Sequence, residues 1–355
     1  MSTTSRRPLV PEDLHNGHND RRAFNRLVAA YVLGKLRHES PAEIIRKTWR
    51  DDPRLALLTR APVTPPASPV TGISQTRILD LLLIAPGSAA AKVFARCMQL
   101  DFTGVYQFNI PHAASHATPL FSGEGLPMNV VMSPVATTPV GPVRKLGFIT
   151  SFTRELAESA AENFAAVIGR LLGEAAAKSL DAAVFSNAAA DSTRPAGLLN
   201  GVVALTGATG ATTADMGAAD VAAFAQAMSD AAINPENMII VASPKSAWNL
   251  RMALGFQTLP LPILMSPAVP AGTVIAIAPE AVASGYEGEP EIDVAQSPSM
   301  HFDDSVPLDL VTGGVAASPA MSTFQKEMLA LKLRVRCAWG SLQPGAVQYT
   351  TTAKW

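Results

Sequence analysis

Cysteine is nearly absent from this chain of 355 residues, which contains only Cys97 and Cys337. Two cysteines cannot form the framework of a small disulfide-stabilised fold, so we expect a reducing compartment and two small, buried apolar thiols. Charged residues are also few, at 16%, whereas hydrophobic residues make up 48%, enough for a packed core. The length allows two or three domains. The composition therefore excludes both a disulfide scaffold and a disordered protein.

Long hydrophobic runs are missing as well. The longest, residues 78–85, contains Asp80 and stops at Pro86, so it is too short to cross a bilayer. Residues 1–25 are polar and rich in arginine, and they lack the apolar stretch of a signal peptide. We therefore expect no membrane partner.

Catalytic and cofactor motifs are also lacking. The sequence has no Gly-x-Ser-x-Gly, no phosphate-binding loop ending in Gly-Lys-Ser/Thr and no His-Glu-x-x-His. The glycine-rich residues 207–217 lack dinucleotide-binding spacing, so we interpret them as a loop. His112 and His116 lie among prolines with no acidic or cysteine neighbour, which argues against a metal site. We predict no enzyme activity, no cofactor and no metal.

Charge is unevenly distributed along the chain. Residues 1–60 hold 12 Arg and Lys against 7 Asp and Glu, a net charge of +5, while the remainder holds 16 against 22, a net charge of −6. Two helices are predicted in this basic segment, over 21–36 and 41–49, and a proline-rich linker follows at 61–72. The segment either contacts something anionic or is a solvated pair of helices, and both interpretations stay open.

One very long helix is the strongest positive signal. Residues 152–180 contain no proline and would span about 44 Å at 1.5 Å per residue. Apolar residues recur there at steps of three and four, at Leu156, Ala160, Phe164, Val167, Ile168, Leu171, Leu172 and Ala175. We expect this stripe to be buried against strands near the end of the chain. Residues 111–142, in contrast, contain six prolines, which exclude a helix and indicate a long extended excursion.

Shorter elements complete the prediction. Helices are expected at 89–100, 220–231 and 244–252, and strands at 104–110, 145–150, 237–243 and 273–278. Residues 329–337 alternate strictly, with apolar side chains on one face and Lys332, Arg334 and Arg336 on the other. Because helices and strands do not alternate regularly, the fold class is α+β.

Five segments, in order, resemble the major capsid proteins of tailed phages of the Hong Kong 97 type. They are PLFSGEGLP from Pro119, the long helix with Glu155, Leu156 and Ser159 at its start and Asp181 and Phe185 at its end, RPAGLLN from Arg194, NMIIVASP from Asn237, and the closing FQKEMLALKLRVRCAWGSLQPGAV from Phe324 with its final Pro344 and Ala346. The resemblance covers roughly residues 119–350. Each motif is weak alone, but the order and spacing of all five are fairly specific.

The resemblance implies an α+β Hong Kong 97-type capsid fold with a long spine helix. The domains it implies are a peripheral domain at 151–194 and 321–355, an axial domain at 195–320, an extended loop at 119–150 and an N-terminal arm region at 73–118, after the basic N-terminal segment 1–60 (scaffold-like or an N-terminal arm) and the linker 61–72. We expect residues 119–145 to project from the body and to pack on an adjacent subunit. About 60 residues are short for a removable scaffolding segment, so its cleavage is doubtful.

The implied function is structural. Such a subunit would form hexamers and pentamers that close into an icosahedral shell around double-stranded DNA, with a portal and a maturation protease as further partners. It would be assembled in the bacterial host cytoplasm and would reside in the virion capsid. The subunit-contact candidates are Gly123, Glu124, Lys145, Arg154, Glu158, Lys332, Arg334 and Arg336. For the last three we expect carboxylates of the same or a neighbouring subunit as partners rather than DNA. Lys145 and Asn129 carry no motif that would support cross-linking.

Two alternatives remain at this level. An encapsulin-like nanocompartment shares the implied fold but packages protein cargo. An α+β enzyme would need a pocket that converges on His301, Asp303 and Asp304.

Overall fold

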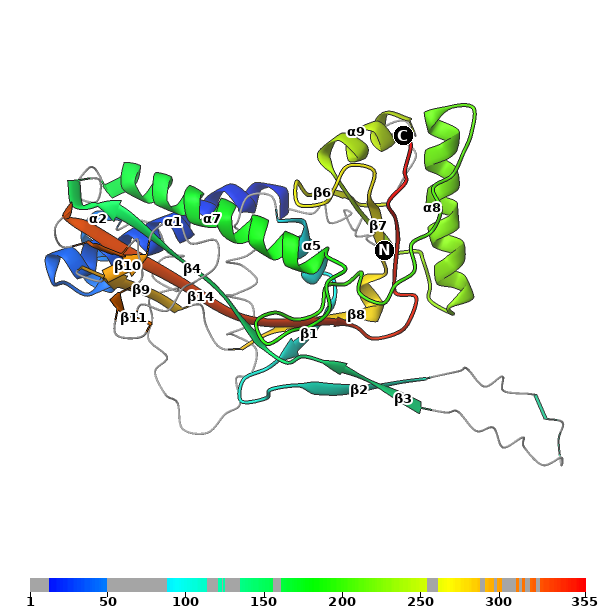
Figure 1. Cartoon of the computed structure of the whole chain (residues 1–355), viewed down its shortest axis with the longest axis horizontal. Coiled ribbons are helices and arrows are strands. Elements are labelled where there is room, and N and C mark those ends of the chain that lie inside the picture. Colours follow the sequence, from blue (N-terminus) through cyan, green and yellow to red (C-terminus); the bar gives the residue numbers. More distant parts are fainter. Residues whose placement is uncertain are drawn as a thin grey trace, which may run out of the picture.

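The computed structural model describes most of the chain and shows an elongated subunit (Figure 1). The described residues are 13–49, 88–113, 121–122, 124, 135–155, 161–253, 261–287, 291–296, 299–301, 311–312, 315–316, 320–323 and 326–355. The linker 61–72 lies outside them.

Helices and strands are mixed along the described chain, as the α+β prediction requires. The helices are α1 (Asp13–Arg37), α2 (Pro41–Thr48), α5 (Ala89–Phe94), α7 (Ala161–Val184), α8 (Thr213–Asp230), α9 (Pro244–Ala253) and the 3-10 helix η1 (Pro279–Ala281). The strands are β1 (Met98–Asp101), β2 (Phe108–Ala113), β3 (Val135–Val140), β4 (Arg144–Thr153), β5 (Ile239–Ala242), β6 (Ile263–Met265), β7 (Val274–Ile277), β8 (Val282–Tyr286), β9 (Glu291–Ala295), β10 (Ser299–His301), β11 (Val311–Thr312), β12 (Val315–Ala316), β13 (Ala320–Ser322), β14 (Met328–Ser341) and β15 (Val347–Thr350).

The larger sheet is built around β14, a strand of 14 residues. Along one edge β14 pairs with β4, and along the other it pairs first with β9 and then with β8, which is followed by β1. Its apolar residues at odd positions from Leu329 to Cys337 are buried, and Lys332 on the other face is exposed. The predicted alternation is therefore confirmed. Helix α7 runs along this sheet with α1 beside it (Figure 1).

The long helix begins later than the sequence predicts. β4 continues through Thr153, and Phe152 pairs with Leu329 in the ladder, so the predicted start at Phe152 is wrong. A run of aromatic, threonine and serine side chains favours the strand there, and β14 is long enough to pair with it. The helix is described from 161 to 184, which includes its predicted core.

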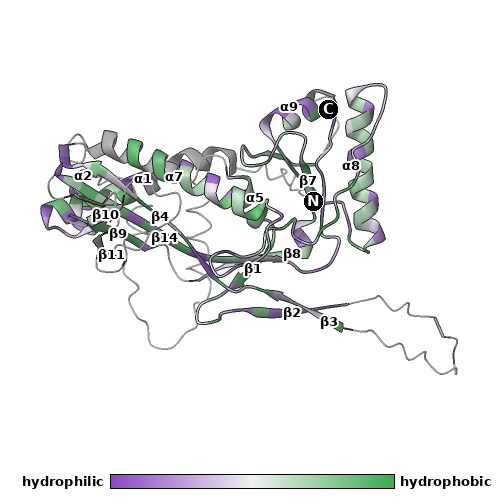
Figure 2. Cartoon of the chain, in the orientation of Figure 1, coloured by the Kyte–Doolittle hydropathy of each residue, from purple (hydrophilic) through white to green (hydrophobic). Residues whose placement is uncertain are grey.

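The buried stripe of α7 is narrower than predicted. Ile168 and Leu172 are buried at 3% and 2% exposure, but Val167 and Leu171 are 45% and 57% exposed. The prediction that Leu171 is buried is therefore wrong, because the helix turns its i, i+4 row toward the core and leaves the adjacent row outside. The side chains of Leu156 and Phe164 lie outside the described residues. Figure 2 shows much of α7 in the hydrophobic colour.

The basic N-terminal helices belong to the main core. α1 buries Val28, Val32 and Leu33, which join the same hydrophobic cluster as Leu172 of α7. Ser40 caps α2 in a capping box: its hydroxyl accepts from the backbone N–H of Glu43, whose carboxylate accepts from the backbone N–H of Ser40. The helix predicted over 41–49 is confirmed as α2, and at least this part of residues 1–60 is folded against the spine helix rather than set apart from it.

The smaller sheet has the order β15-β7-β5-β6, and α8 and α9 pack against it. Every residue of β5 and β7 is buried, which is the pattern of a strand covered on both faces. Helix α8 begins at Thr213 rather than Asp220, with Thr212 as its cap. Gly217 and the alanines around it have the composition of a loop, which is why the sequence did not predict a helix there. In the structure a Cβ at Gly217 would lie only 3.0 Å from Leu250, so glycine permits the close approach of α8 to α9.

The strand pairings cross the boundaries of the predicted domains, which stay a prediction, and one predicted helix needs correction. β8 and β9 lie within the predicted axial segment 195–320, but they pair with β14 of the larger sheet, while β15 from the predicted peripheral segment pairs with β7. Strand pairing, not chain order, decides sheet membership. Within the predicted helix 89–100, α5 ends at Phe94 and β1 follows it, because β8 offers a parallel partner to β1.

A buried carboxylate ties the two sheets together. Asp181, near the end of α7, accepts hydrogen bonds from the Ser88 hydroxyl at 2.8 Å and from the backbone N–H groups of Ala89 and Ala90 at 3.1 and 3.0 Å. It also accepts one from the Ser266 hydroxyl, just after β6, at 2.6 Å. The carboxylate thus accepts hydrogen bonds from the backbone N–H groups at the start of α5, which have no partner within the helix, and it links the spine helix to the smaller sheet.

Candidate functional site

The clearest feature outside the body is a two-stranded ribbon formed by β2 and β3. The strands pair antiparallel over six residue pairs, from Phe108 opposite Val140 to Ala113 opposite Val135. Figure 1 shows this ribbon running away from the two sheets. The sequence predicts that residues 119–145 project, and β3 within this range does so, whereas Arg144 and Lys145 already belong to β4.

Among the described residues, the ribbon is anchored to the body at its base. Val140 is fully buried in a small cluster with Phe102, Ala338 and Leu342, and the rings of Phe102 and Phe108 meet edge to face at 5.0 Å. Farther out, β3 alternates between exposed and half-buried residues, and Val135 is 67% exposed. An exposed valine on a ribbon without a core of its own marks a surface suited to contact with another molecule.

The outer face of β14 carries the predicted cations. Arg334 forms an ion pair with Glu291 of β9, and Arg336 forms one with Glu287 at 2.9 Å between Nη1 and Oε1. Lys332 lies directly opposite Asp293 in the ladder. The expectation of carboxylate partners is confirmed for the two arginines, within the same chain. Such partly exposed pairs contribute roughly 0–1 kcal/mol each.

Positive charge is in excess where the ribbon joins the sheet. Lys145 of β4 lies directly opposite Arg336, and like charges in that position repel. Lys145 is exposed, and within the described ranges no carboxylate pairs with it. Beside it, the Arg144 guanidinium is 3.4 Å from the Tyr106 hydroxyl.

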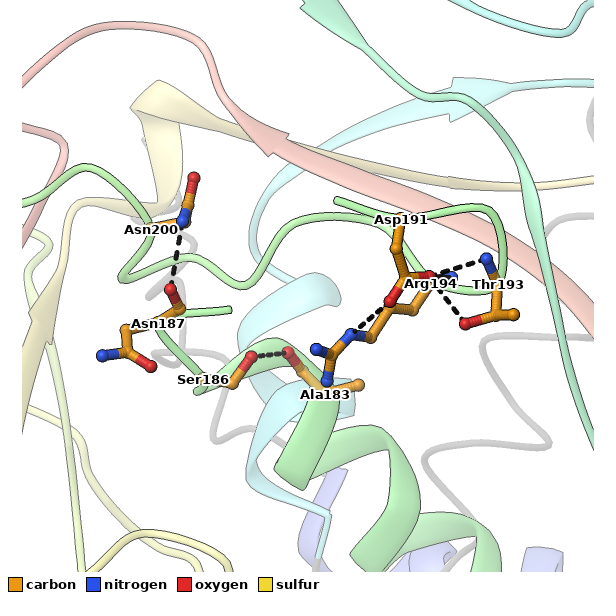
Figure 3. A network of polar contacts seen from close by, with 7 residues as sticks. All are labelled: Ala183, Ser186, Asn187, Asp191, Thr193, Arg194 and Asn200. Carbon is orange, nitrogen blue, oxygen red and sulfur yellow. Dashed lines mark hydrogen bonds and ion pairs between the residues drawn. The ribbon is translucent and has the colours of Figure 1, made fainter. Parts of the chain in front are cut away.

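The loop that follows α7 is held by its own polar contacts (Figure 3). Asn200 donates to the backbone oxygen of Asn187 at 3.0 Å. Asp191 accepts from the hydroxyl and backbone N–H of Thr193, both at 2.6 Å, and from the backbone N–H of Arg194 at 2.9 Å. The hydrogen bonds from Thr193, followed by those from Arg194, hold the pKa of the Asp191 carboxyl well below its usual range. The loop thus has a fixed shape.

Gly197 lies at the centre of the motif RPAGLLN. A Cβ there would collide with the backbone oxygen of Ser186, so no other residue fits without moving the backbone. The loop, the ribbon base at Thr138 and the β14–β15 turn at Gln343 enclose a groove of about 610 Å³. The described residues of its lining include no Asp, Glu, Lys, Arg or His, so they supply no group for acid–base chemistry.

Most of the remaining predicted residues lie outside the described part of the chain. Glu124 and Arg154 are exposed, while Gly123, Glu158, Asn129, Asp303 and Asp304 lie outside the described residues. Cys97 and Cys337 are buried and unpaired, as predicted, and burial raises the pKa of each thiol to about 12. In the part of the chain that the structure describes, no group of three His, Cys, Asp or Glu side chains could hold a metal, and no helix is long and apolar enough to cross a membrane.

Sequence reasoning missed two buried carboxylates. In the sequence, Asp181 was recognised as part of a motif with Phe185. Its hydrogen-bond partners Ser88 and Ser266, however, lie about 90 residues away on either side in the sequence. Asp220 accepts from the indole N–H of Trp355 at 2.7 Å, across 135 positions. A lone Asp in a helix gives no sequence signal for such a partner.

A family model described as phage capsid protein matches residues 109–346. This chain belongs to the phage capsid protein family. The match includes the ribbon from residue 109 on, the spine helix, and both sheets except β1 and β15, so the features described above are those of a capsid protein.

Solved structures from phages share the fold of this capsid protein. A chain from Mycobacterium phage Adephagia has a TM-score of 0.55 at 14% identity, over 84% of this chain and 97% of that one. Chains from Mycobacterium phages Bobi and Cain both give 0.53, at 15% and 16% identity; the first match covers 85% of this chain and 98% of that one, the second 73% and 89%. No curated protein matches the sequence.

The predicted recognition and fold class are confirmed. The protein is a tailed-phage major capsid protein with the α+β fold of the Hong Kong 97 type. It is a structural, non-enzymatic subunit of the phage head, it self-assembles into a shell, and it is located in the virion capsid. The enzyme alternative is thereby set aside.

Proposed function

We propose that this capsid protein forms hexamers and pentamers that close into an icosahedral shell around double-stranded DNA, and that the β2–β3 ribbon of each subunit lies on a neighbouring subunit. The observation that carries the proposal is the ribbon itself, which is anchored at Val140 and exposed at Val135. An isolated two-stranded ribbon is at best marginally stable in water, so a neighbour would supply its missing cover.

Of the proposed subunit-contact residues, Lys145 and Arg336 lie at the base of this ribbon, whereas Arg154 lies at the far end of β4. Lys145, left without a carboxylate in the described chain, sits at the ribbon base, and Glu124 lies between β2 and β3 in the sequence. Lys332, Arg334 and Arg336 form the outer face next to it, with Arg154 just beyond the end of β4. Gly123 and Glu158 lie outside the described residues, and they belong to the proposed set on the basis of the sequence alone.

The ribbon can be shortened without disturbing its base. Ile110 and Thr138 lie directly opposite each other, so a two-residue Asn-Gly turn can replace residues 111–137, remove the exposed Val135 and close a hairpin on the anchored base. We expect a folded monomer with the wild-type thermal midpoint that forms no shells in electron micrographs. Normal shells from this variant would overturn the role of the ribbon. The control is the wild-type chain purified and imaged in parallel.

The contents of the shell separate DNA from protein cargo. We expect particles isolated from a producing host to contain nuclease-protected double-stranded DNA, loaded with the help of a portal. Particles that hold only a defined protein cargo would contradict this and support the encapsulin-like alternative.

Intact-mass measurement of the subunit in mature particles tests whether a protease removes the N-terminal segment. We expect α1 to be retained, because its buried residues belong to the main core.

A further inference from the structure

The two helices that cover the smaller sheet present opposite surfaces to the outside. The outward side of α9 carries Trp248 and Met252, which are 50% and 65% exposed and lie one helical turn apart. Its inward side, with Ala247 and Leu250, is fully buried. Two large apolar side chains at i and i+4 form one contiguous patch, unlike a single exposed apolar residue.

The α9 patch is also cationic. The helix contains Lys245 and Arg251 and no acidic residue. The Arg251 guanidinium lies 5.8 Å from the centre of the Trp248 ring and donates to the backbone oxygen of Ile263 at 2.8 Å. The tryptophan is therefore held in place before any partner arrives. Tryptophan and arginine are the residue types that most often dominate binding energy at protein interfaces.

Helix α8 has the complementary character. Its 18 residues include three aspartates and no Lys, Arg or His. Asp220 is buried, whereas Asp215 and Asp230 are exposed near its two ends. Between them the exposed residues are Ala218, Ala219, Ala222, Ala223, Gln226 and Ser229, of which all but Gln226 are small. Figure 2 shows α8 in pale colours over most of its length, with hydrophilic patches.

The geometry allows both surfaces to be used at once. Within one subunit α8 and α9 touch through Gly217 and Leu250, which face inward, so their exposed sides are left for other molecules. In Figure 1 α8 forms the outer edge of the smaller sheet region, and α9 caps it near the C-terminus. A flat alanine surface with acidic ends fits a bulky cationic surface, and the partner that certainly carries such a surface is a second copy of this chain.

We propose that the α9 patch (Lys245, Trp248, Met252) of one subunit packs on the exposed alanine face of α8 in the next subunit of the capsomer. Because the two surfaces differ, the contact is heterologous, and repeated heterologous contacts close into a ring when the rotation allows it. The proposal rests on the proposed hexamers and pentamers and names the contact that would close them. The ribbon plays no part in it.

Disulfide trapping tests the contact directly. The double variant Ala222→Cys, Met252→Cys places one thiol on each surface, and the native Cys97 and Cys337 are buried and do not compete. On oxidation of assembled particles we expect a ladder of linked species up to five and six subunits. Neither single variant should give more than monomer. The matched control is Val203→Cys, Met252→Cys, because Val203 is 83% exposed on a loop outside both helices.

A second pair of variants reports on assembly without new cysteines. Trp248→Ala and Ala222→Arg change exposed residues, so we expect unchanged thermal midpoints and at least a tenfold loss of shell yield, while the exposed neighbour Asn249→Ala assembles normally. Wild-type yields from both variants, or equal ladders from the control cysteine pair, would overturn the α8–α9 contact. If instead the wild-type chain forms no capsomers, the proposed function itself fails.

Discussion

The ladder of β4 with β14 and the ladder of β2 with β3 are built alike and used differently. Both are antiparallel, with ten and six residue pairs, and the chain passes from β3 to β4 through only three residues. The first has apolar residues such as Leu331 packed into the main core, whereas the second has cover only at its base. The comparison teaches that strand pairing alone does not bury a ladder. The ladder that helices pack against becomes part of the core, and the ladder without such packing remains an exposed surface for contacts.

Removing the cover should break the body completely. We expect a chain that begins at residue 50 to lose cooperative unfolding and to aggregate, because α1 buries Val28, Val32 and Leu33 in the main core. Solubility and a thermal melt followed by circular dichroism provide the measurement. A soluble truncated chain with a wild-type midpoint would show that the N-terminal helices are dispensable, as a scaffolding segment would be.

Two adjacent leucines in α7 sharpen the comparison within one helix. Leu172→Ala should cost about 3 kcal/mol of unfolding free energy, because Leu172 is 2% exposed. Leu171→Ala, at 57% exposure, should cost less than about 1 kcal/mol. Denaturant titration of both variants decides the matter, and equal losses would mean that the row at Leu171 is also core.

The buried carboxylate offers a smaller effect. Asp181→Asn keeps the size of the side chain but replaces one acceptor oxygen by an NH₂ group that faces donors such as the Ser88 and Ser266 hydroxyls. We expect a loss of about 2 kcal/mol in unfolding free energy. The exposed carboxylate of Glu174, changed to Gln, is the control, and a similar small loss in both variants would contradict the structural role of Asp181.

The smallest effect is expected on the outer face of the larger sheet. Arg336→Gln removes the ion pair with Glu287, which is about one-third exposed on both sides, so unfolding free energy should fall by roughly 0–1 kcal/mol. Assembly yield measured against salt concentration adds a second test. If empty shells form normally at every salt concentration and only DNA-filled particles lose stability, DNA is the partner of this face.

Periodic patterns were sufficient to predict most elements of the body. The alternation of β14, the apolar run of β5 and the proline-free stretch of α7 all correspond to observed elements. The predictions failed where the local sequence is ambiguous. β4 continues through Phe152 because β14 pairs with it. The first seven residues of α8 were not predicted as helix, because an alanine-rich segment with Gly217 resembles a loop in composition.

For contacts between residues distant in sequence, the sequence predicted the chemical type of the partner but not which residue supplies it. The alternation in β14 indicated that Arg334 and Arg336 need carboxylates, but not that Glu291 and Glu287 supply them. The buried face of α7 was predicted as one stripe, yet its phase depends on α1, whose packing on α7 no local pattern reveals. Long-range contacts of this kind follow from the assembled fold rather than from any single segment.

The four hydrogen bonds at Asp181 have a mechanical consequence. They join α7, the start of α5 and the end of β6 at one point, so the two sheets cannot rotate against each other without losing several bonds at once. In the proposed shell the same chain occupies rings of five and rings of six, whose neighbours meet at different angles. A subunit stiffened at Asp181 would absorb that difference in its ribbon and in the contacts between copies, leaving its own interior unchanged.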